Sequence, residues 1–288
     1  MKQITLLILT LFLVHFGVTA QIRFVKVNGE IRQFTIYEPS GMTDSVTVPL
    51  LLNFHGQGMT SGEQMMYSKT NELADQNGFI VVYPQGINND WNVGFEQDYD
   101  SGTNDVAFIK TLIEKLDKYY PIDTSKVFAV GISRGGFFVQ RLVAELPGTL
   151  NGIVSVGAPL PVEVRQRMPA EVAVKVLYVH GNRDDIVDIA GDEPHYLSLR
   201  ETIAFWRGRH RAAVEPEERL FNAANDDGTM VRYVSYGGTP QTSMLLVENG
   251  GHTWPGADSF NIGLPLGETT RDIPFNSFIW DYLMDKHP

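Results

Sequence analysis

Short apolar runs alternate along this chain with stretches of helical periodicity. The runs are Pro49–Phe54, Phe79–Tyr83, Val127–Val130, Gly152–Val156 and Val174–Val179. The helical stretches are Glu63–Asn77, Asp105–Tyr120, Gly135–Leu146 and Leu197–Arg209. A continuous apolar run of this length is typical of a strand buried on both faces, and strands separated by helices form mainly parallel sheets.

The two ends of the chain add further elements. Ile22–Val27 and Ile31–Tyr37 flank an Asn-Gly pair, which favours a tight hairpin turn. Met230–Tyr236 and Ser243–Glu248 form a final pair of strands, and Asp272–Met284 is the closing helix. The predicted fold is of the α/β class, a mainly parallel sheet with an antiparallel N-terminal edge and helices on both faces. Ligands of such sheets bind beyond the carboxyl ends of the strands.

Residues 1–20 have the pattern of a secretory signal peptide. A positive charge at Lys2 precedes the apolar run Ile4–Val14, and Val18-Thr19-Ala20 offers the small residues that a signal peptidase recognises. The apolar run is shorter than the roughly 20 residues that a membrane-spanning helix needs. We expect cleavage after Ala20, a single α/β domain over residues 21–288, and secretion to the periplasm or the extracellular medium.

Composition narrows the range of partners. The formal net charge is −11 and no run of Lys or Arg occurs, which argues against nucleic acid as a partner. The sequence contains no Cys, so neither a disulfide nor attachment through a lipidated cysteine can form. We predict no cofactor, no metal site and, once the leader is removed, no membrane contact; the oligomeric state stays open.

A G-x-S-x-G motif, Gly131-Ile132-Ser133-Arg134-Gly135, directly follows the strand Val127–Val130 and leads into a helix. In that context the motif is a nucleophile elbow. Side chains at 131 and 135 would collide with neighbouring backbone, and the strained turn lifts the Ser133 hydroxyl out of the sheet edge. We predict that Ser133 is a nucleophile; the alternative is a tight turn with an incidental serine.

A serine hydroxyl is a weak nucleophile and needs an adjacent base. In this fold the acid and then the histidine follow the serine along the chain. His252 fits the base, because Gly250 and Gly251 before it let the loop after the last strand turn back over the sheet edge. We interpret His180, at the end of a strand, as a buried histidine that orients the acid loop, and His195 as a surface residue.

The acid should lie after the strand Val174–Val179, where the sequence continues His-Gly-Asn-Arg-Asp-Asp. Its carboxylate accepts a hydrogen bond from the histidine, fixes the tautomer and stabilises the imidazolium. Asp184 and Asp185 both satisfy this position, and Asp188 is a more distant third. The residues by themselves leave the choice open.

The tetrahedral intermediate of acyl transfer also needs hydrogen-bond donors for its oxyanion. The residue after the nucleophile, here Arg134, supplies one backbone N–H, and a loop after an early strand supplies the other. His55-Gly56-Gln57-Gly58 follows the strand Pro49–Phe54, and Gln57 would present its N–H there. The alternative for this segment is an ordinary glycine turn.

Six segments resemble one group of secreted α/β-hydrolases, the polyhydroxybutyrate depolymerases, feruloyl esterases and acetylxylan esterases of the carbohydrate esterase family 1 type. They are Leu51–Gly58 (LLNFHGQG), Phe79–Gly86 (FIVVYPQG) with Trp91-Asn92, Asp105–Ile109 (DVAFI), Val127–Gly136 (VFAVGISRGG), Val176–Asp184 (VLYVHGNRD) and Gly250–Gly256 (GGHTWPG). They span nearly the whole chain after the leader in the order of the group. The run that ends in HTWPG is the most specific.

The resemblance implies an α/β-hydrolase fold and a role for each residue of a triad. Ser133 would be the nucleophile and His252 the base. Asp184 would be the acid in preference to Asp185, because it holds the place of the acid after the His-Gly turn.

The resemblance also assigns Gln57 and Arg134 the oxyanion donors, and Trp91 and Trp254 a place in the substrate cleft, although a core position for Trp254 is an equal alternative. The chain departs from the group at two of these positions. Members often have Cys at the place of Gln57, and a small or amide residue at that of Arg134. A cation at a helix N-terminus opposes the helix dipole. We therefore expect Arg134 to pair with a carboxylate such as Asp105, or to contact an acidic group on the substrate.

Together these features predict a secreted serine carboxylesterase that acts through an acyl-enzyme. Its substrate would be a small or polysaccharide-linked ester, with feruloyl or acetyl esters of plant polysaccharides favoured. The alternatives are depolymerisation of polyhydroxyalkanoate or another short polyester and, with less support, a serine peptidase of the same fold or an inactive sugar-binding homologue.

Overall fold

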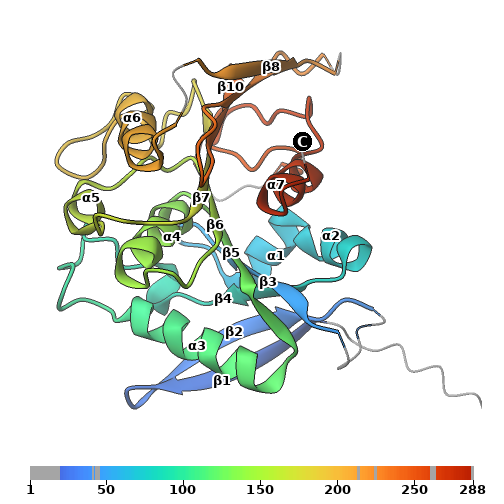
Figure 1. Ribbon diagram of the computed structural model, residues 1–288, viewed down its shortest axis with the longest axis vertical. Coiled ribbons are helices and arrows are strands. Elements are labelled where there is room, and N and C mark those ends of the chain that lie inside the picture. The colour runs from blue at the N-terminus through green and yellow to red at the C-terminus, as the bar shows by residue number, and fades with distance from the viewer. Residues whose placement is uncertain are drawn as a thin grey trace, which may run out of the picture.

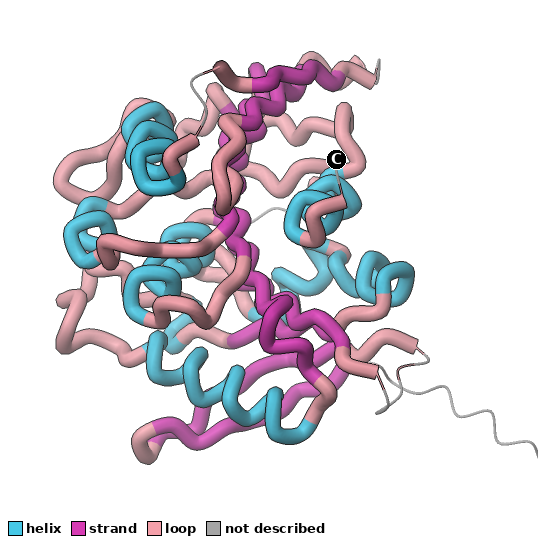
Figure 2. Tube along the Cα trace, viewed as in Figure 1, coloured by secondary structure: helices cyan, strands magenta, loops and turns pink. Residues whose placement is uncertain are grey.

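The computed structural model describes residues 20–40, 42, 46–212, 215–223, 226–259 and 264–286. Within these residues the chain forms one sheet in the strand order β1-β2-β4-β3-β5-β6-β7-β10-β9-β8 (Figures 1 and 2). All but the last residue of the predicted leader, 1–20, lie outside the described residues, so the leader stays an expectation.

The elements have the following bounds. The strands are β1 (Ala20–Val27), β2 (Glu30–Tyr37), β3 (Val48–Phe54), β4 (Ile80–Pro84), β5 (Ile122–Ile132), β6 (Gly152–Val156), β7 (Lys175–Gly181), β8 (Glu217–Phe221), β9 (Met230–Ser235) and β10 (Thr242–Glu248). The helices are α1 (Ser61–Ser68), α2 (Thr70–Asn77), α3 (Asp105–Tyr119), α4 (Arg134–Glu145), α5 (Val162–Arg167), α6 (Leu199–His210) and α7 (Phe275–Leu283), with a 3₁₀ turn at η1 (Ile87–Asn89).

The centre of the sheet is parallel and both of its edges are antiparallel. Strands β4, β3, β5, β6, β7 and β10 run in one direction. The hairpin β1–β2 pairs antiparallel with β4 at one edge, as the Asn-Gly turn predicts. Strands β9 and β8 add a second antiparallel edge. The predicted α/β fold is confirmed, although β8 was not expected, because its largely exposed residues give no apolar signal.

Helices cover both faces of the sheet. Figure 1 shows α3, α4, α5 and α6 on one side and α1, α2 and α7 on the other. The buried apolar side chains accordingly form two clusters, one beneath each layer. The central strands β4, β6 and β7 are buried at every position, as their continuous apolar runs predict. Among the described residues no helix is long and apolar enough to cross a membrane.

One predicted helix is broken in two. The segment predicted as a single helix over 63–77 is α1 followed by α2, with Lys69 between them in the left-handed conformation, at φ 51°. The hydroxyls of Ser68 and Thr70 both accept from the buried Asn53 side-chain amide, at 2.9 and 3.1 Å. The break turns these hydroxyls to Asn53 Nδ2 on β3, while Asn53 Oδ1 accepts from the Gln64 side chain at 2.8 Å. Apolar periodicity carries no sign of such a requirement.

Candidate active site

The turn from β5 to α4 holds Ser133 at φ 55° and ψ −126°, a conformation that L-residues rarely adopt. A Cβ at Gly131 would lie 2.4 Å from the Gly135 carbonyl carbon, and one at Gly135 would lie 2.5 Å from the Phe54 carbonyl oxygen. Both glycines are therefore required sterically, as the motif predicts. The Ser133 N–H donates to the Val156 carbonyl at 2.8 Å, which fixes the turn against β6.

The loop after β7 brings Asp184 to His252. His252 Nδ1 donates to Asp184 Oδ2 at 2.6 Å, while Asp184 Oδ1 accepts from the backbone N–H groups of Ile186 and Val187 at 2.9 and 2.8 Å. Burial raises the pKa of Asp184, but the hydrogen bond and charge of His252 outweigh burial and hold that pKa below its ordinary value. Asp185 is exposed on the same loop. The ambiguity between the two carboxylates is thus resolved geometrically in favour of Asp184 as the partner of His252.

The His252 loop is held at its backbone and beneath its ring. His252 N–H donates to the Leu266 carbonyl at 2.6 Å, and Gly251 N–H donates to the Glu268 carbonyl at 2.9 Å. Gly157, just beyond β6, lies directly beneath the imidazole: a Cβ there would lie 2.8 Å from both Cε1 and Nδ1. The ring can occupy its position only because residue 157 has no side chain.

Two other histidines near this edge are buried and form hydrogen bonds with backbone groups. His180 Nε2 donates to the Val187 carbonyl at 2.9 Å, which supports the Asp184 loop as predicted. His55 Nδ1 donates to the Gly56 carbonyl at 2.8 Å, and its Nε2 accepts from Gly86 N–H at 3.0 Å. Burial lowers the pKa of His55 to about 4, so its ring is neutral at physiological pH.

A small pocket opens at the carboxyl edge of the sheet. Ser133 and His252 both line it, together with Gly56, Gln57, Met59, Tyr67, Ile132, Ile186, Leu264 and Leu266. Among the described residues of this lining, His252 and the phenol of Tyr67 are the ionisable groups. The pocket therefore suits an uncharged, largely apolar group beside the Ser133 hydroxyl.

The residues predicted to supply the oxyanion donors, Gln57 and Arg134, lie in the loop after β3 and at the start of α4. Within the described residues no backbone hydrogen bond uses the N–H of Gln57 or of Arg134. Arg134 begins α4, where the first N–H groups of a helix have no carbonyl within the helix to bind. The N–H groups of Gln57 and Arg134 therefore remain the predicted oxyanion donors.

The Arg134 side chain is buried, and its partners differ from the expected one. Its Nε contacts Asp90 at 3.2 Å and its Nη2 contacts Glu96 at 2.7 Å. The expected partner, Asp105, instead pairs with Arg32 at 2.6 Å. Arg134 thus does pair with carboxylates, as expected, but the expected residue, Asp105, is not one of them. Partial burial raises the pKa of Asp90, and the charge of Arg134 offsets this only in part.

The placement of two tryptophans in the substrate cleft is wrong. Trp91 is 1% exposed, donates to the His55 carbonyl at 3.0 Å and stacks on Phe138. Trp254 is also 1% exposed and donates to Asn276 at 3.0 Å. Neither lines the pocket at Ser133. Their buried indoles find partners inside the protein, so Trp254 adopts the core position that was the alternative.

Sequence reasoning missed most of the pocket wall. Met59, Tyr67, Ile186 and Leu266 come from four separate segments and carry no motif. Gly157 was also missed, although its place one residue after β6, at the edge that carries Ser133, was a usable signal.

The chain is similar to several known esterases. A model of the Phospholipase/Carboxylesterase family matches residues 90–204. The bifunctional acetylxylan esterase/xylanase XynS20E of Neocallimastix patriciarum is 28% identical over 88% of this chain and 36% of its own length. Poly(3-hydroxyalkanoate) depolymerase C of Paucimonas lemoignei is 26% identical over 84% of this chain and 56% of its own length. This chain thus spans about a third to about half of these two relatives.

Among solved structures, the acetyl xylan esterase from Aspergillus awamori superposes with a TM-score of 0.63 at 18% identity, over 81% of this chain and 94% of that protein. At this identity the likeness establishes the fold. The chain has the α/β-hydrolase fold, and the relatives and structural neighbours named here are carboxylic ester hydrolases. It is related to the acetylxylan esterases, feruloyl esterases and polyhydroxyalkanoate depolymerases, so the resemblance found in its motifs is confirmed.

Proposed function

We propose that this esterase uses Ser133 as nucleophile, His252 as general base and Asp184 as the acid that orients the histidine. The observation that carries the proposal is the 2.6 Å hydrogen bond from His252 Nδ1 to Asp184, made beside the pocket that Ser133 lines. A carboxylate can only accept, so Nδ1 carries the proton. Nε2 is then unprotonated and able to take a proton from the serine.

The proposed reaction has two halves. Ser133 Oγ attacks the ester carbonyl as its proton passes to His252 Nε2, and the oxyanion binds the N–H groups of Gln57 and Arg134. The C–O bond to the alcohol breaks as His252 protonates the leaving oxygen, which leaves an acyl-enzyme on Ser133. Water, deprotonated by His252, attacks the acyl carbonyl; the serine then leaves with the proton.

We propose feruloyl or acetyl esters of plant polysaccharides as the substrates. The pocket wall of Met59, Ile186, Leu264 and Leu266 suits an uncharged acyl group, and the polar alcohol would remain outside it. A relative that cleaves poly(3-hydroxyalkanoate) makes a short polyester the second candidate.

We also propose that the protein is secreted after cleavage behind Ala20. The proposal rests on the charge, apolar run and small residues of positions 1–20. Mass spectrometry of protein recovered from the periplasm and the medium should find Gln21 at the mature N-terminus. Recovery of the full-length chain from cells alone would contradict it.

The catalytic assignment is tested with a fluorophosphonate probe and with 4-nitrophenyl acetate. The wild type should be labelled, Ser133→Ala should not, and Ser133→Ala and His252→Ala should each reduce kcat by about 10⁴-fold or more. Asp184→Asn should cost about 10⁴-fold, because the amide favours the wrong tautomer. Asp185→Asn, exposed on the same loop, is the matched control and should retain activity. Turnover by folded Ser133→Ala near the wild-type rate would overturn the assignment.

The substrate class is tested with methyl ferulate, acetylated xylan and hydroxybutyrate oligomers at equal ester concentration. The proposal expects kcat/KM to be highest for one of the two plant esters. Preference for the hydroxybutyrate oligomers would transfer the assignment to the polyester, and cleavage of peptide amides alone would indicate a peptidase.

A further inference from the structure

The side chains of the two proposed oxyanion donors bind each other. Arg134 Nη2 donates to Gln57 Oε1 at 3.2 Å, although the two residues are 77 positions apart. Their backbone N–H groups belong to two different segments, the loop after β3 and the first turn of α4. The distance between these two donors is therefore set by tertiary contacts: the pairing of β3 with β5 brings the two segments together, and this hydrogen bond joins their side chains.

Asp90 closes the contact into a triangle. Asp90 Oδ1 forms an ion pair with Arg134 Nε at 3.2 Å, and Asp90 Oδ2 accepts a hydrogen bond from the Gln57 side-chain amide at 3.4 Å. The next peptide is tied to the same segment, since Gly58 N–H donates to the Asn89 carbonyl at 2.8 Å. The amide of Gln57 is thus held at its oxygen by Arg134 and at its nitrogen by Asp90. Rotation of the Gln57 peptide would have to break these contacts.

The guanidinium is suited to this position. Its Nε contacts Asp90, and its Nη2 binds both Gln57 and Glu96. The guanidinium carbon also lies 4.9 Å from the centroid of the Phe95 ring. An ammonium on a flexible stem cannot reproduce such a planar fork. The arginine side chain is 7% exposed, and the Glu96 side chain is 63% exposed. Glu96 is accordingly an outer partner that touches neither Gln57 nor Asp90 in the described contacts.

We propose that Arg134 is a positioning residue, which with Gln57 and Asp90 holds the two oxyanion donors at the spacing that the transition state requires. The proposal rests on the esterase mechanism given above. Interactions realised mainly in the transition state affect kcat more than KM. Loss of the triangle should therefore lower kcat and the affinity for a transition-state analogue, with little effect on KM.

The test compares purified variants in hydrolysis of 4-nitrophenyl acetate and in binding of a phenylboronic acid, which forms a tetrahedral adduct with the serine. Arg134→Gln, Gln57→Ala and Asp90→Ala should each lower kcat by about 10-fold, with KM changed less than about threefold. This is less than the roughly 10²–10³-fold cost of losing a donor outright, because the donor is displaced and not removed. Boronate affinity should fall in parallel with kcat. Arg134→Lys should recover only a minor part of the loss. The double variant Arg134→Gln/Gln57→Ala should be no slower than the worse single variant, because both remove the same contact.

Asp90→Ala separates positioning from a direct effect of charge. If Arg134 acted only by its positive charge on the oxyanion, removing the Asp90 carboxylate would raise kcat. The positioning proposal requires kcat to fall.

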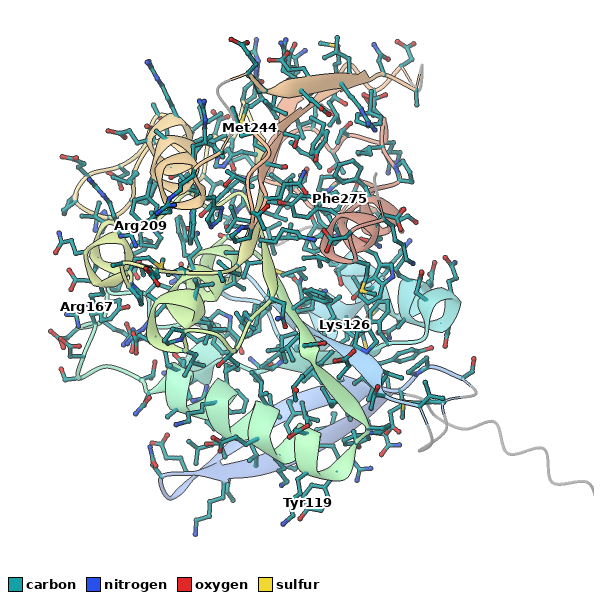
Figure 3. The ribbon with its side chains drawn as sticks, in the orientation of Figure 1. Tyr119, Lys126, Arg167, Arg209, Met244 and Phe275 are labelled. Carbon is teal, nitrogen blue, oxygen red and sulfur yellow. The ribbon has the colours of Figure 1, made fainter. Side chains whose placement is uncertain are left out.

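Two controls separate positioning from a loss of general structure. Arg167→Gln removes an arginine of α5, labelled in Figure 3. Its guanidinium forms an ion pair with Asp100 at the surface. Glu96→Gln removes the outer partner of Arg134. Both should keep kcat within about twofold of wild type. If either lowers kcat as much as Arg134→Gln does, the effect belongs to the loop between β4 and α3 and the proposal fails.

The two proposals fail in different ways. A wild-type rate in Arg134→Gln, while Ser133→Ala is inactive, overturns the positioning role and leaves the esterase mechanism intact. Activity in Ser133→Ala removes the mechanism itself, whatever the Arg134 variants do.

Discussion

At the scale of single residues, the His252 position depends on what is missing at residue 157. Gly157 has φ 57° and lies against both His252 and Asp184: an added Cβ would be 2.8 Å from the imidazole and 3.4 Å from Asp184 Oδ2. A contact of 2.8 Å between a methyl carbon and a ring cannot persist without displacement. Since the ring is fixed by its hydrogen bond to Asp184, displacement would move the base relative to Ser133.

We therefore expect Gly157→Ala to lower kcat for 4-nitrophenyl acetate by at least about 10-fold, since misplacement of a catalytic group by about 1 Å can cost up to about 100-fold. Gly148→Ala is the matched control: its φ is +79° but nothing lies within 4 Å of the added Cβ. Both variants should lose about 1–2 kcal/mol of stability from backbone strain, and only Gly157→Ala should lose activity. Equal activities in steady-state assays of the two variants would contradict this reading.

At the scale of elements, one buried ion pair joins β2 to the start of α3. Asp105 Oδ1 accepts from Arg32 at 2.6 Å, and Oδ2 accepts from Asn92 N–H at 2.9 Å and from the Thr103 hydroxyl at 2.8 Å. Both charged side chains are nearly inaccessible, at 4% and 1% exposure. The pair thus fixes the loop between β4 and α3 at Asn92 and Thr103, and the same loop supplies Asp90 and Glu96 to Arg134.

Removing one partner of a buried pair leaves an uncompensated charge. Arg32→Met should reduce the free energy of unfolding by about 3–5 kcal/mol, because the Asp105 carboxylate remains buried without its cation. Arg232→Met is the matched control on β9, where the guanidinium binds Glu218 and Glu248 at the surface, and it should change stability little. Urea unfolding followed by tryptophan fluorescence measures both. A midpoint for Arg32→Met that equals that of Arg232→Met would disprove the anchoring role.

At the scale of the whole molecule, burial of three histidines couples stability to pH. Burial lowers the pKa of His55 and of His210 to about 4, and burial also lowers the pKa of His180. In the unfolded chain a histidine titrates near its ordinary value of about 6.5. Between these values the unfolded state binds more protons than the native state. The free energy of unfolding therefore rises with pH across this window and falls as the solution is acidified.

We expect stability to be lost between about pH 6.5 and pH 4, at up to about 1.4 kcal/mol per pH unit for each histidine. His210→Gln should make this slope shallower, because one of the three groups is removed while the amide can still bond the Thr242 hydroxyl. Urea unfolding at a series of pH values gives the slope directly. A variant slope as steep as that of the wild type would refute the contribution of His210.

The local features of the molecule, its buried strands and its tight turn at Ser133, could be predicted from the sequence. Buried strands were predicted because a strand covered on both faces must be apolar at every position, and the elbow because only glycine fits where Gly131 and Gly135 meet the backbone. The break in the helix at Lys69 was not predicted, because the hydroxyls on either side of it bind the buried Asn53 amide on β3, outside the helical segment. The strand β8 escaped because its exposed residues carry no burial pattern.

Contacts between distant segments were decided by the tertiary structure. The sequence contains two adjacent carboxylates, Asp184 and Asp185. The path of their loop over the sheet edge places Asp184 within hydrogen-bond distance of His252. The sequence contains a cation directly after the serine. The fold brings two loops to it: the loop after β3 supplies Gln57, and the loop between β4 and α3 supplies Asp90 and Glu96. The sequence analysis assigned Trp91 and Trp254 to the substrate cleft, whereas both are buried in the core. A strand buried on both faces and a tight turn each leave a pattern in consecutive residues, whereas the partner of a charged or aromatic side chain depends on which loops the fold brings together.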